Sequence, residues 1–129
     1  MSQFTHMIYG RVFDRFPNLK SAFLEAGCGW VPYLIERIDR NTAGKGRKLA
    51  SEQVRDHPVY FHAELAEREV LPFSVSVVGE DRFVYASDFP HEPDDEVMEV
   101  LEEFLEREDL SDSAKRKIVY DNIKALYSI

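Results

Sequence analysis

The sequence is poor in cysteine and in long apolar runs. Its one cysteine, Cys28, has no disulfide partner within the chain. We therefore expect a reducing, cytoplasmic setting, with the thiol between two glycines acting as a small packing residue. No apolar run approaches the roughly 18 to 20 residues that cross a bilayer. His6 and Arg11 interrupt the N-terminal segment, which therefore does not resemble a secretory signal peptide.

Positive charge is also scarce. There are 16 lysines and arginines against 24 aspartates and glutamates, giving a net charge of -8. Because phosphate binding requires a basic face, this balance argues against nucleic acid and against an anionic membrane surface as partners. The chain has 129 residues, enough for one domain with a hydrophobic core and too few for two. We expect a single domain over residues 1–129.

Strand-like and helix-like segments alternate along the chain. Apolar spacing predicts helices over residues 3–14, 30–40, 72–78 and 92–109, a short helical turn capped by Ser51, and a last helix capped by Ser111 or Ser113. Strands are predicted over residues 19–25, 58–63 and 82–86. Alternation of this kind implies parallel pairing, because the chain needs a crossover to return to the same end of a sheet. The sequence therefore predicts an α/β fold with about three parallel strands and flanking helices.

Residues 41–48 form a basic, glycine-rich stretch between two of these segments. The spacing does not match the GxxxxGK[ST] phosphate loop, and no strand leads into it. We interpret it as a solvated linker. A small-anion site is the alternative, and it would require this loop to face the carboxyl ends of the strands.

Polar candidates follow each predicted strand. Glu25 follows the first, His62 and Glu64 end the second, and Asp88 ends the third with His91 close behind. The carboxyl ends of parallel strands meet at one edge, so Glu25, His62 or Glu64, and Asp88 are expected to converge. Carboxylates and imidazoles suit Zn²⁺, Mn²⁺ or Fe²⁺. Plainer interpretations exist: Asp88 accepting backbone N–H groups in a turn, His91 on a surface loop, and His62 in the core.

Three groups of motifs then point to a family. They are GRVFDRFPNLK at residues 10–20 with FLEAGCGWVP at 23–32, GEDR at 79–82 with ASDFPH at 86–91, and KRKI at 115–118 with the later DN and LY pairs. In this order they resemble the amidohydrolase-2 family, which includes the aminocarboxymuconate-semialdehyde decarboxylase-like enzymes.

The resemblance implies a metal-dependent (β/α)8 TIM barrel about twice this length, of which this chain is the C-terminal portion, with strands equivalent to strands six to eight. The family holds its metal with a His-x-His pair after the first strand, a histidine after the fifth and an aspartate after the eighth. Asp88 matches that aspartate, which is also the base. Glu25 matches a position after strand six where many members carry histidine. This sequence contains no His-x-His.

These features predict the C-terminal portion of a metal-dependent hydrolase or decarboxylase that is inactive alone. Asp88 is the expected catalytic residue and metal ligand, Glu25 a second ligand, and His91, His62 and Trp30 the substrate-binding candidates. A divalent metal, zinc being favoured, is expected only if another chain completes the site. That chain is a second copy or a separate N-terminal barrel half, and the substrate is a small molecule. The alternative is a non-catalytic, self-associating α/β module or a degenerate fragment without cofactor.

Overall fold

Three short parallel strands form the centre of the computed structural model, which describes all of residues 1–129. They are β1 (Ser21–Phe23), β2 (Val59–His62) and β3 (Phe83–Val84), in the order β1-β2-β3. Phe23 lies opposite Phe61, and Phe61 lies opposite Phe83, with all pairings parallel. The predicted parallel α/β sheet is therefore confirmed.

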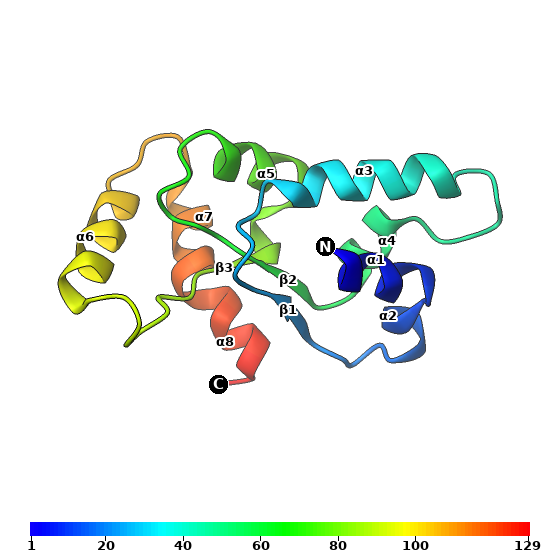
Figure 1. Ribbon diagram of the computed structural model, residues 1–129, viewed down its shortest axis with the longest axis horizontal. Helices are drawn as coiled ribbons and strands as arrows, with labels where there is room; N and C mark the ends of the chain where they lie inside the picture. Colours follow the sequence, from blue (N-terminus) through cyan, green and yellow to red (C-terminus); the bar gives the residue numbers. More distant parts are fainter.

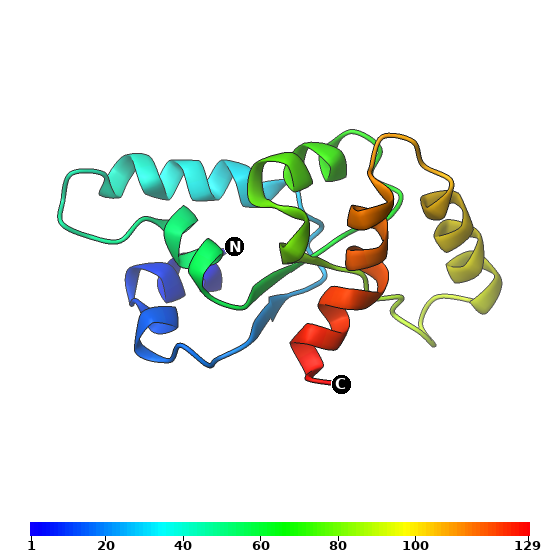
Figure 2. The ribbon, with the colours of Figure 1, turned by 180° about the vertical axis from the view of Figure 1, so that it is seen from behind.

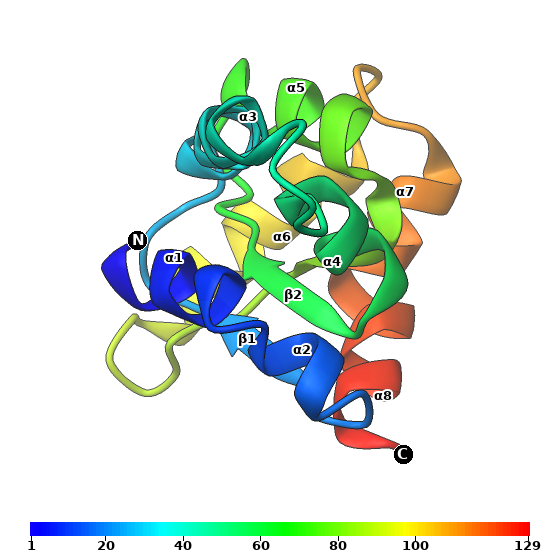
Figure 3. The ribbon, with the colours of Figure 1, turned by 90° about the vertical axis from the view of Figure 1, so that its right-hand side faces the viewer.

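Helices connect the strands and pack around them. In chain order they are α1 (Ser2–Tyr9), α2 (Val12–Arg15), α3 (Trp30–Thr42), α4 (Ala50–Asp56), α5 (Val70–Val78), the 3-10 turn η1 (Glu80–Arg82), α6 (Asp94–Leu105), α7 (Asp112–Arg116), the π-helical turn η2 (Lys117–Asp121) and α8 (Asn122–Tyr127). Figure 1 shows α6 at one end of the molecule, beyond the ends toward which the strands run, while α3 and its following loop extend the other way. In the view turned by 90° about the vertical axis, α3 and α5 lie side by side above β2 (Figure 3). None of these helices is long and apolar enough to cross a bilayer.

The core is centred on the ring of Phe61, which is 0% exposed. Phe23 stacks on it with ring centroids 5.9 Å apart, and Phe4 and Trp30 meet it edge-on, each at 5.6 Å. Phe83 completes this aromatic core from β3, at 6.2 Å. Burying each such ring stabilises the fold by about 1.5–3 kcal/mol, so the sheet is held chiefly by the apolar face from which Phe61 projects.

The predicted helix over residues 3–14 is broken into α1 and α2. Gly10 caps α1, and Arg11 adopts a left-handed conformation with φ of 52° before α2 begins. Glycine has low helix propensity, which favours a break here. The turn brings Phe13 into the core, where it is 0% exposed. Burial of the Phe13 ring therefore favours two short helices over the single helix that the apolar spacing predicted.

One of the predicted helix caps is confirmed and another is wrong. Ser111 caps α7 by accepting the Ala114 N–H at 3.1 Å, as predicted. The prediction that Ser51 caps the helical turn after the basic loop is wrong. The Asp39 carboxylate of α3 instead accepts the N–H groups of Ala50 at 2.6 Å and Ser51 at 3.3 Å.

The C-terminal helices occupy the edge of β3. The Tyr85 N–H donates to the Ile118 carbonyl at 3.0 Å, and the Asn122 side-chain amide donates to the carbonyls of Glu80 and Phe83, both at 2.8 Å. Seen from behind, η2 and α8 (orange to red) run down the side of the sheet beside β3 (Figure 2). Only the β1 edge of the sheet therefore lacks a neighbouring element with backbone pairing.

Candidate functional site

The carboxyl ends of the strands open into a cavity of about 250 Å³. Its acidic side chains are Glu25 after β1, Glu64 after β2, Asp88 after β3, and Glu92 and Glu96 from α6 and the turn before it. We call these five residues the carboxyl rim. His62, the last residue of β2, also lines the cavity. The structure thus brings together the strand-end residues that the parallel pairing predicted to converge, while their chemical roles remain predictions.

Two residues of the carboxyl rim adopt an unusual backbone conformation. Glu25 has φ of 63° and Asp88 has φ of 56°, both in the left-handed region. For residues other than glycine this conformation costs roughly 1–2 kcal/mol. Strain of this kind persists only where the surrounding structure holds it, and it often accompanies functional sites. The two residues predicted to hold a metal are therefore both strained.

The Asp88 turn groups three possible ligands. The Asp88 carbonyl accepts the N–H groups of His91 at 2.7 Å and Glu92 at 3.3 Å. One ligand atom from each of these three side chains lies within 4.8 Å of the others, and all three residues are exposed. The plainer interpretation, in which Asp88 accepts backbone N–H groups in a turn, is therefore confirmed, and the bonds go to its carbonyl, so that the carboxylate stays free.

His62 is buried, with 3% of its surface exposed. Its Nδ1 accepts the Glu25 N–H at 3.2 Å, and its Nε2 lies 3.4 Å from the Ala86 carbonyl. The Glu64 carboxylate is also 3.3 Å from Nδ1. Both ring nitrogens thus face groups of the protein, so a substrate contact through either of them would require one of these bonds to break.

The carboxylates of the carboxyl rim are largely without partners. Four of the five accept no hydrogen bond and form no ion pair, and Glu64 approaches only His62. Burial, and to a lesser extent the charge of Glu64, raises the pKa of the nearby Tyr85 hydroxyl. Unpaired oxygens around a small cavity are the donor set that hard or borderline divalent cations prefer.

Two rim residues were not singled out from the sequence. Glu92 and Glu96 were interpreted as part of the solvated acidic face of a helix, yet both line the cavity. Glu96 lies in the first turn of α6, and Glu92 lies two residues before the helix begins. Both positions were visible in the sequence, but which side of α6 faces the strands depends on tertiary packing.

Trp30 and Cys28 lie away from the cavity chemistry. The Trp30 indole donates to the Gly27 carbonyl at 3.1 Å, and its ring belongs to the aromatic core. Cys28 is 0% exposed, and burial raises the pKa of its thiol to about 12. Its sulfur lies 3.2 Å from the Glu67 carboxylate. A thiol of this kind is a packing residue rather than a nucleophile.

The basic loop lies at the other end of the sheet. Lys48 pairs with Asp14 and Asp56, each at 3.0 Å. His57, next to the start of β2, also binds Asp14 at 3.0 Å. The anion-site alternative required this loop to face the carboxyl ends of the strands, and the pairing of Lys48 with groups beside the opposite ends contradicts it.

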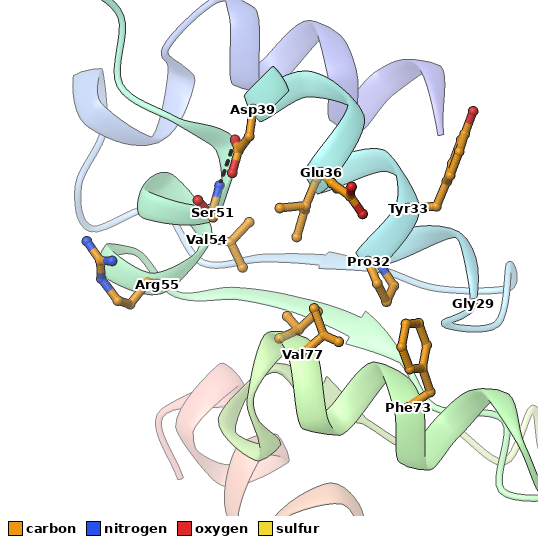
Figure 4. A pocket seen from close by; sticks show the side chains of 12 residues that line it. Gly29, Pro32, Tyr33, Glu36, Asp39, Ser51, Val54, Arg55, Phe73 and Val77 are labelled. Carbon is orange, nitrogen blue, oxygen red and sulfur yellow. Dashed lines mark hydrogen bonds between the residues drawn. The ribbon is translucent and has the colours of Figure 1, made fainter. Parts of the chain in front are cut away.

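A larger hollow of about 700 Å³ lies between α3, α4 and α5. Figure 4 shows Phe73 and Val77 of α5 on one side of it and Pro32 of α3 on the other, with Asp39 bonded to Ser51 at its far side. Because the Asp39 carboxylate caps α4, Glu36 is the one acid of this groove without a partner, and no second free carboxylate and no imidazole lines the groove with it. The candidate site is therefore the smaller cavity at the carboxyl rim.

Comparison with known proteins gives concordant results. The sequence model of the amidohydrolase family matches residues 1–129. The 2-amino-3-carboxymuconate-6-semialdehyde decarboxylase of Dictyostelium discoideum is 32% identical over 89 residues, which are 65% of this chain and 24% of that protein.

Solved structures share the fold. An amidohydrolase from Mycobacterium avium subsp. paratuberculosis matches with a TM-score of 0.77 and 29% identity, covering 95% of this chain and 32% of that one. A dihydroxybenzoic acid decarboxylase from Polaromonas, solved with manganese and an inhibitor, matches with a TM-score of 0.66 and 23% identity, covering 91% and 36%. This chain spans 24% of the curated relative and 32% and 36% of the two solved chains. From the match of the family model along its whole length, the chain belongs to the amidohydrolase family.

Proposed function

We propose that this chain is the C-terminal portion of a metal-dependent hydrolase or decarboxylase of the amidohydrolase type. Its strands β1, β2 and β3 then correspond to strands six, seven and eight of a (β/α)8 barrel. Three parallel strands with helical crossovers support this proposal, as does the fold similarity to part of a longer amidohydrolase chain at a TM-score of 0.77. In such barrels the chemistry lies at the carboxyl ends of the strands, which is where the carboxyl rim lies.

One observation carries the proposal: Glu25 and Asp88 line one cavity at the strand ends, and neither carboxylate has a cationic partner. Carboxylate oxygens, with the imidazole of His91 near Asp88, form a donor set that fits Zn²⁺ or Mn²⁺. Asp88 is the proposed metal ligand and proton acceptor, and Glu25 the second ligand. When bound, a divalent metal would polarise an oxygen of the substrate. Zinc remains the favoured ion, and the Polaromonas decarboxylase carries manganese.

The protein's own groups have distinct tasks in this scheme. Asp88 is exposed, so its carboxylate can reach both a cation and a substrate proton. His91, beside it and also exposed, is the proposed substrate contact. Trp30 is less suited to the same task, because its ring packs in the aromatic core. The substrate is a small molecule that enters between α6 and the strand ends.

We further propose that a second polypeptide completes the site, and that this chain alone is inactive. A catalytic zinc site uses three protein ligands and an open position, and the carboxyl rim offers no His-x-His pair. The missing histidines would come from an N-terminal barrel half or from another copy. Closure of the barrel would require new strands on both the β1 edge and the β3 edge, and on the β3 side the bond from the Tyr85 N–H to the Ile118 carbonyl would have to open.

Metal titration of the purified chain, alone and mixed with a polypeptide that carries the missing histidines, tests the ligands. Mn²⁺ binding, followed by electron paramagnetic resonance, should weaken at least about tenfold in Asp88→Asn and in Glu25→Gln. Asp95→Asn is the matched control, since Asp95 is an exposed acid of α6 outside the cavity lining. Equal Mn²⁺ affinity in all four proteins would overturn the metal site.

Activity requires a second measurement. The chain is mixed with a polypeptide that carries a His-x-His pair and the fifth-strand histidine, and CO₂ release from small carboxylates is followed. Turnover is expected in the mixture only, and it should disappear with Asp88→Asn. Turnover by the chain alone would contradict the proposed need for a second polypeptide.

The non-catalytic, self-associating module remains the second candidate. It is favoured by the apolar side chains exposed around the groove of Figure 4, with Tyr33 67%, Phe73 59% and Val77 56% exposed. Light scattering that shows a metal-free oligomer, dissociated by Phe73→Ser, together with no Asp88-dependent Mn²⁺ binding, would favour it over the enzyme. In either case the single buried thiol of Cys28 suits a reducing cytosol.

A further inference from the structure

His62 stands between the two loops that carry the proposed metal ligands. It ends the middle strand of the sheet, and its register partner is Val84 of β3. Its imidazole is buried, with the residue 3% exposed. From this position it reaches the segment after β1 on one side and the segment after β3 on the other.

The hydrogen bonds of His62 define one tautomer. Nδ1 accepts the Glu25 N–H at 3.2 Å, so we assign the ring proton to Nε2, which faces the Ala86 carbonyl at 3.4 Å. The Glu64 carboxylate, 3.3 Å from Nδ1, would need a proton on that nitrogen instead. Nδ1 cannot serve both, and the half-exposed Glu64 carboxylate can turn to water.

The backbone groups that His62 contacts in these two loops form no other hydrogen bonds. The Glu25 N–H and the Ala86 carbonyl have no hydrogen-bond partner besides His62. Glu25 itself is left-handed, and Ala86 lies two residues before the left-handed Asp88. A left-handed residue other than glycine keeps its conformation only where neighbouring groups hold it. His62 holds the backbone at Glu25 itself and, across the cavity, at Ala86, which leads into the turn that the Asp88 carbonyl closes.

We propose that His62 is a positioning residue, whose two ring nitrogens hold the backbones of the Glu25 and Asp88 loops at a fixed separation. The proposal rests on the proposed function, in which those two residues bind a metal. An imidazole suits the task because it presents an acceptor and a donor on one rigid ring. The substrate-binding role predicted for His62 is thereby replaced by an action through Glu25 and Asp88.

The tautomer and the bond to Glu25 are tested on the unaltered chain. In ¹⁵N NMR spectra, Nδ1 of His62 should show the shift of an unprotonated nitrogen and Nε2 that of a protonated one. The Glu25 amide should exchange with D₂O at least about tenfold more slowly than an unstructured amide. A protonated Nδ1 together with an unprotected Glu25 amide would overturn the proposal.

Variants then separate positioning from a plain packing role. His62→Phe keeps the ring volume without either hydrogen bond, and His62→Gln can restore an acceptor and a donor. In His62→Phe, Glu25 amide protection should fall at least about tenfold relative to that of Phe61, and Mn²⁺ affinity should fall at least about tenfold. His62→Gln should recover part of both losses. His57→Gln, which alters a histidine at the other end of the sheet, should change neither.

The results distinguish this proposal from the one on which it rests. If the unaltered chain binds no Mn²⁺ either alone or with the second polypeptide, the metal site is lost, while the nitrogen shifts and the Glu25 exchange still decide whether His62 holds the loops. If His62→Phe binds Mn²⁺ as tightly as the unaltered chain, His62 is not a positioning residue, whatever its packing. If His62→Phe does not fold, His62→Gln and the spectra of the unaltered chain decide.

Discussion

The charged side chains at the two ends of the sheet differ in whether they have partners within the protein. We call the charged residues around the starts of the strands the amino rim; they are Asp14, Lys20, Lys48, Asp56, His57, Glu80, Asp81 and Lys117. All of these are bonded within the protein. The carboxyl rim holds five carboxylates, four of them without any partner. Charge at the amino rim stabilises the fold, and charge at the carboxyl rim is left available for a ligand, a division typical of barrel enzymes.

The pKa values at the amino rim follow from this pairing. Burial alone would raise the pKa of Asp14, but hydrogen bonds from Lys48, His57 and Arg11 lower it to about 2. Hydrogen bonds to Asp81 and Glu80 raise the pKa of Lys117 to about 12. These bonds join the loop before α4 and the C-terminal helices to the starts of β2 and β3.

The largest expected effect on the free energy of unfolding comes from replacing Arg107, a buried charged residue near the carboxyl rim that does have hydrogen-bond partners. Arg107 is 5% exposed, and its guanidinium donates to the carbonyls of Leu65 at 2.8 Å, Glu67 at 3.0 Å and Arg68 at 3.1 Å. Arg107→Met should lower the free energy of unfolding by about 3 kcal/mol or more, because each carbonyl left buried without a donor costs about 1–3 kcal/mol. Urea unfolding followed by circular dichroism measures it.

Arg68→Met is the matched control for Arg107→Met. The Arg68 side chain is 64% exposed, and its guanidinium pairs with Glu103 at 3.0 Å. An exposed pair of this kind contributes at most about 1 kcal/mol. If both variants lose equally little, the loop after β2 is held by apolar packing rather than by Arg107.

The direct comparison of the two rims is made by removing one charge from each. Asp14→Asn should lower the free energy of unfolding by about 2 kcal/mol, since a carboxylate with three hydrogen-bonded basic partners loses its charge. Asp88→Asn should change it by less than about 0.5 kcal/mol, because an exposed carboxylate without partners contributes little. The same urea titration serves both. Equal losses would abolish the distinction between the rims.

The pH dependence of stability should come mainly from the amino rim. Asp14 has a pKa of about 2 in the folded chain against 3.8 for the free group. Its contribution is therefore fully present above about pH 4 and is lost as the pH falls toward 2. Over that range the unaltered chain should lose about 1–2 kcal/mol more than Asp14→Asn, as measured by urea unfolding at several pH values. Parallel pH profiles would show that Asp14 is not ion-paired in solution.

The sequence predicted the elements that depend on local pattern and on topology. Alternating segments implied the parallel sheet, and the sheet in turn implied that Glu25, His62 and Asp88 would share an edge. Details that depend on tertiary contacts were not predicted. The residues 82–86 form only a two-residue strand, because Glu80–Arg82 is a 3-10 turn, and the capping of α4 by Asp39 joins residues 11 apart in sequence.

The last prediction concerns the strained backbone of Glu25 at the carboxyl rim. Glu25 keeps a left-handed backbone, with φ of 63°, although no contact of its own side chain requires it. Glu25→Gly should be more stable than Glu25→Ala by about 0.5–1 kcal/mol, because glycine adopts this conformation without steric conflict and loses part of the gain to its greater unfolded-state entropy. Both variants lack the carboxylate, so the urea-unfolding difference isolates the backbone. Neither should bind Mn²⁺ as the unaltered chain does. Equal stability would mean that the loop relaxes in both variants, so that the bond from the Glu25 N–H to His62 does not hold this backbone in the left-handed conformation.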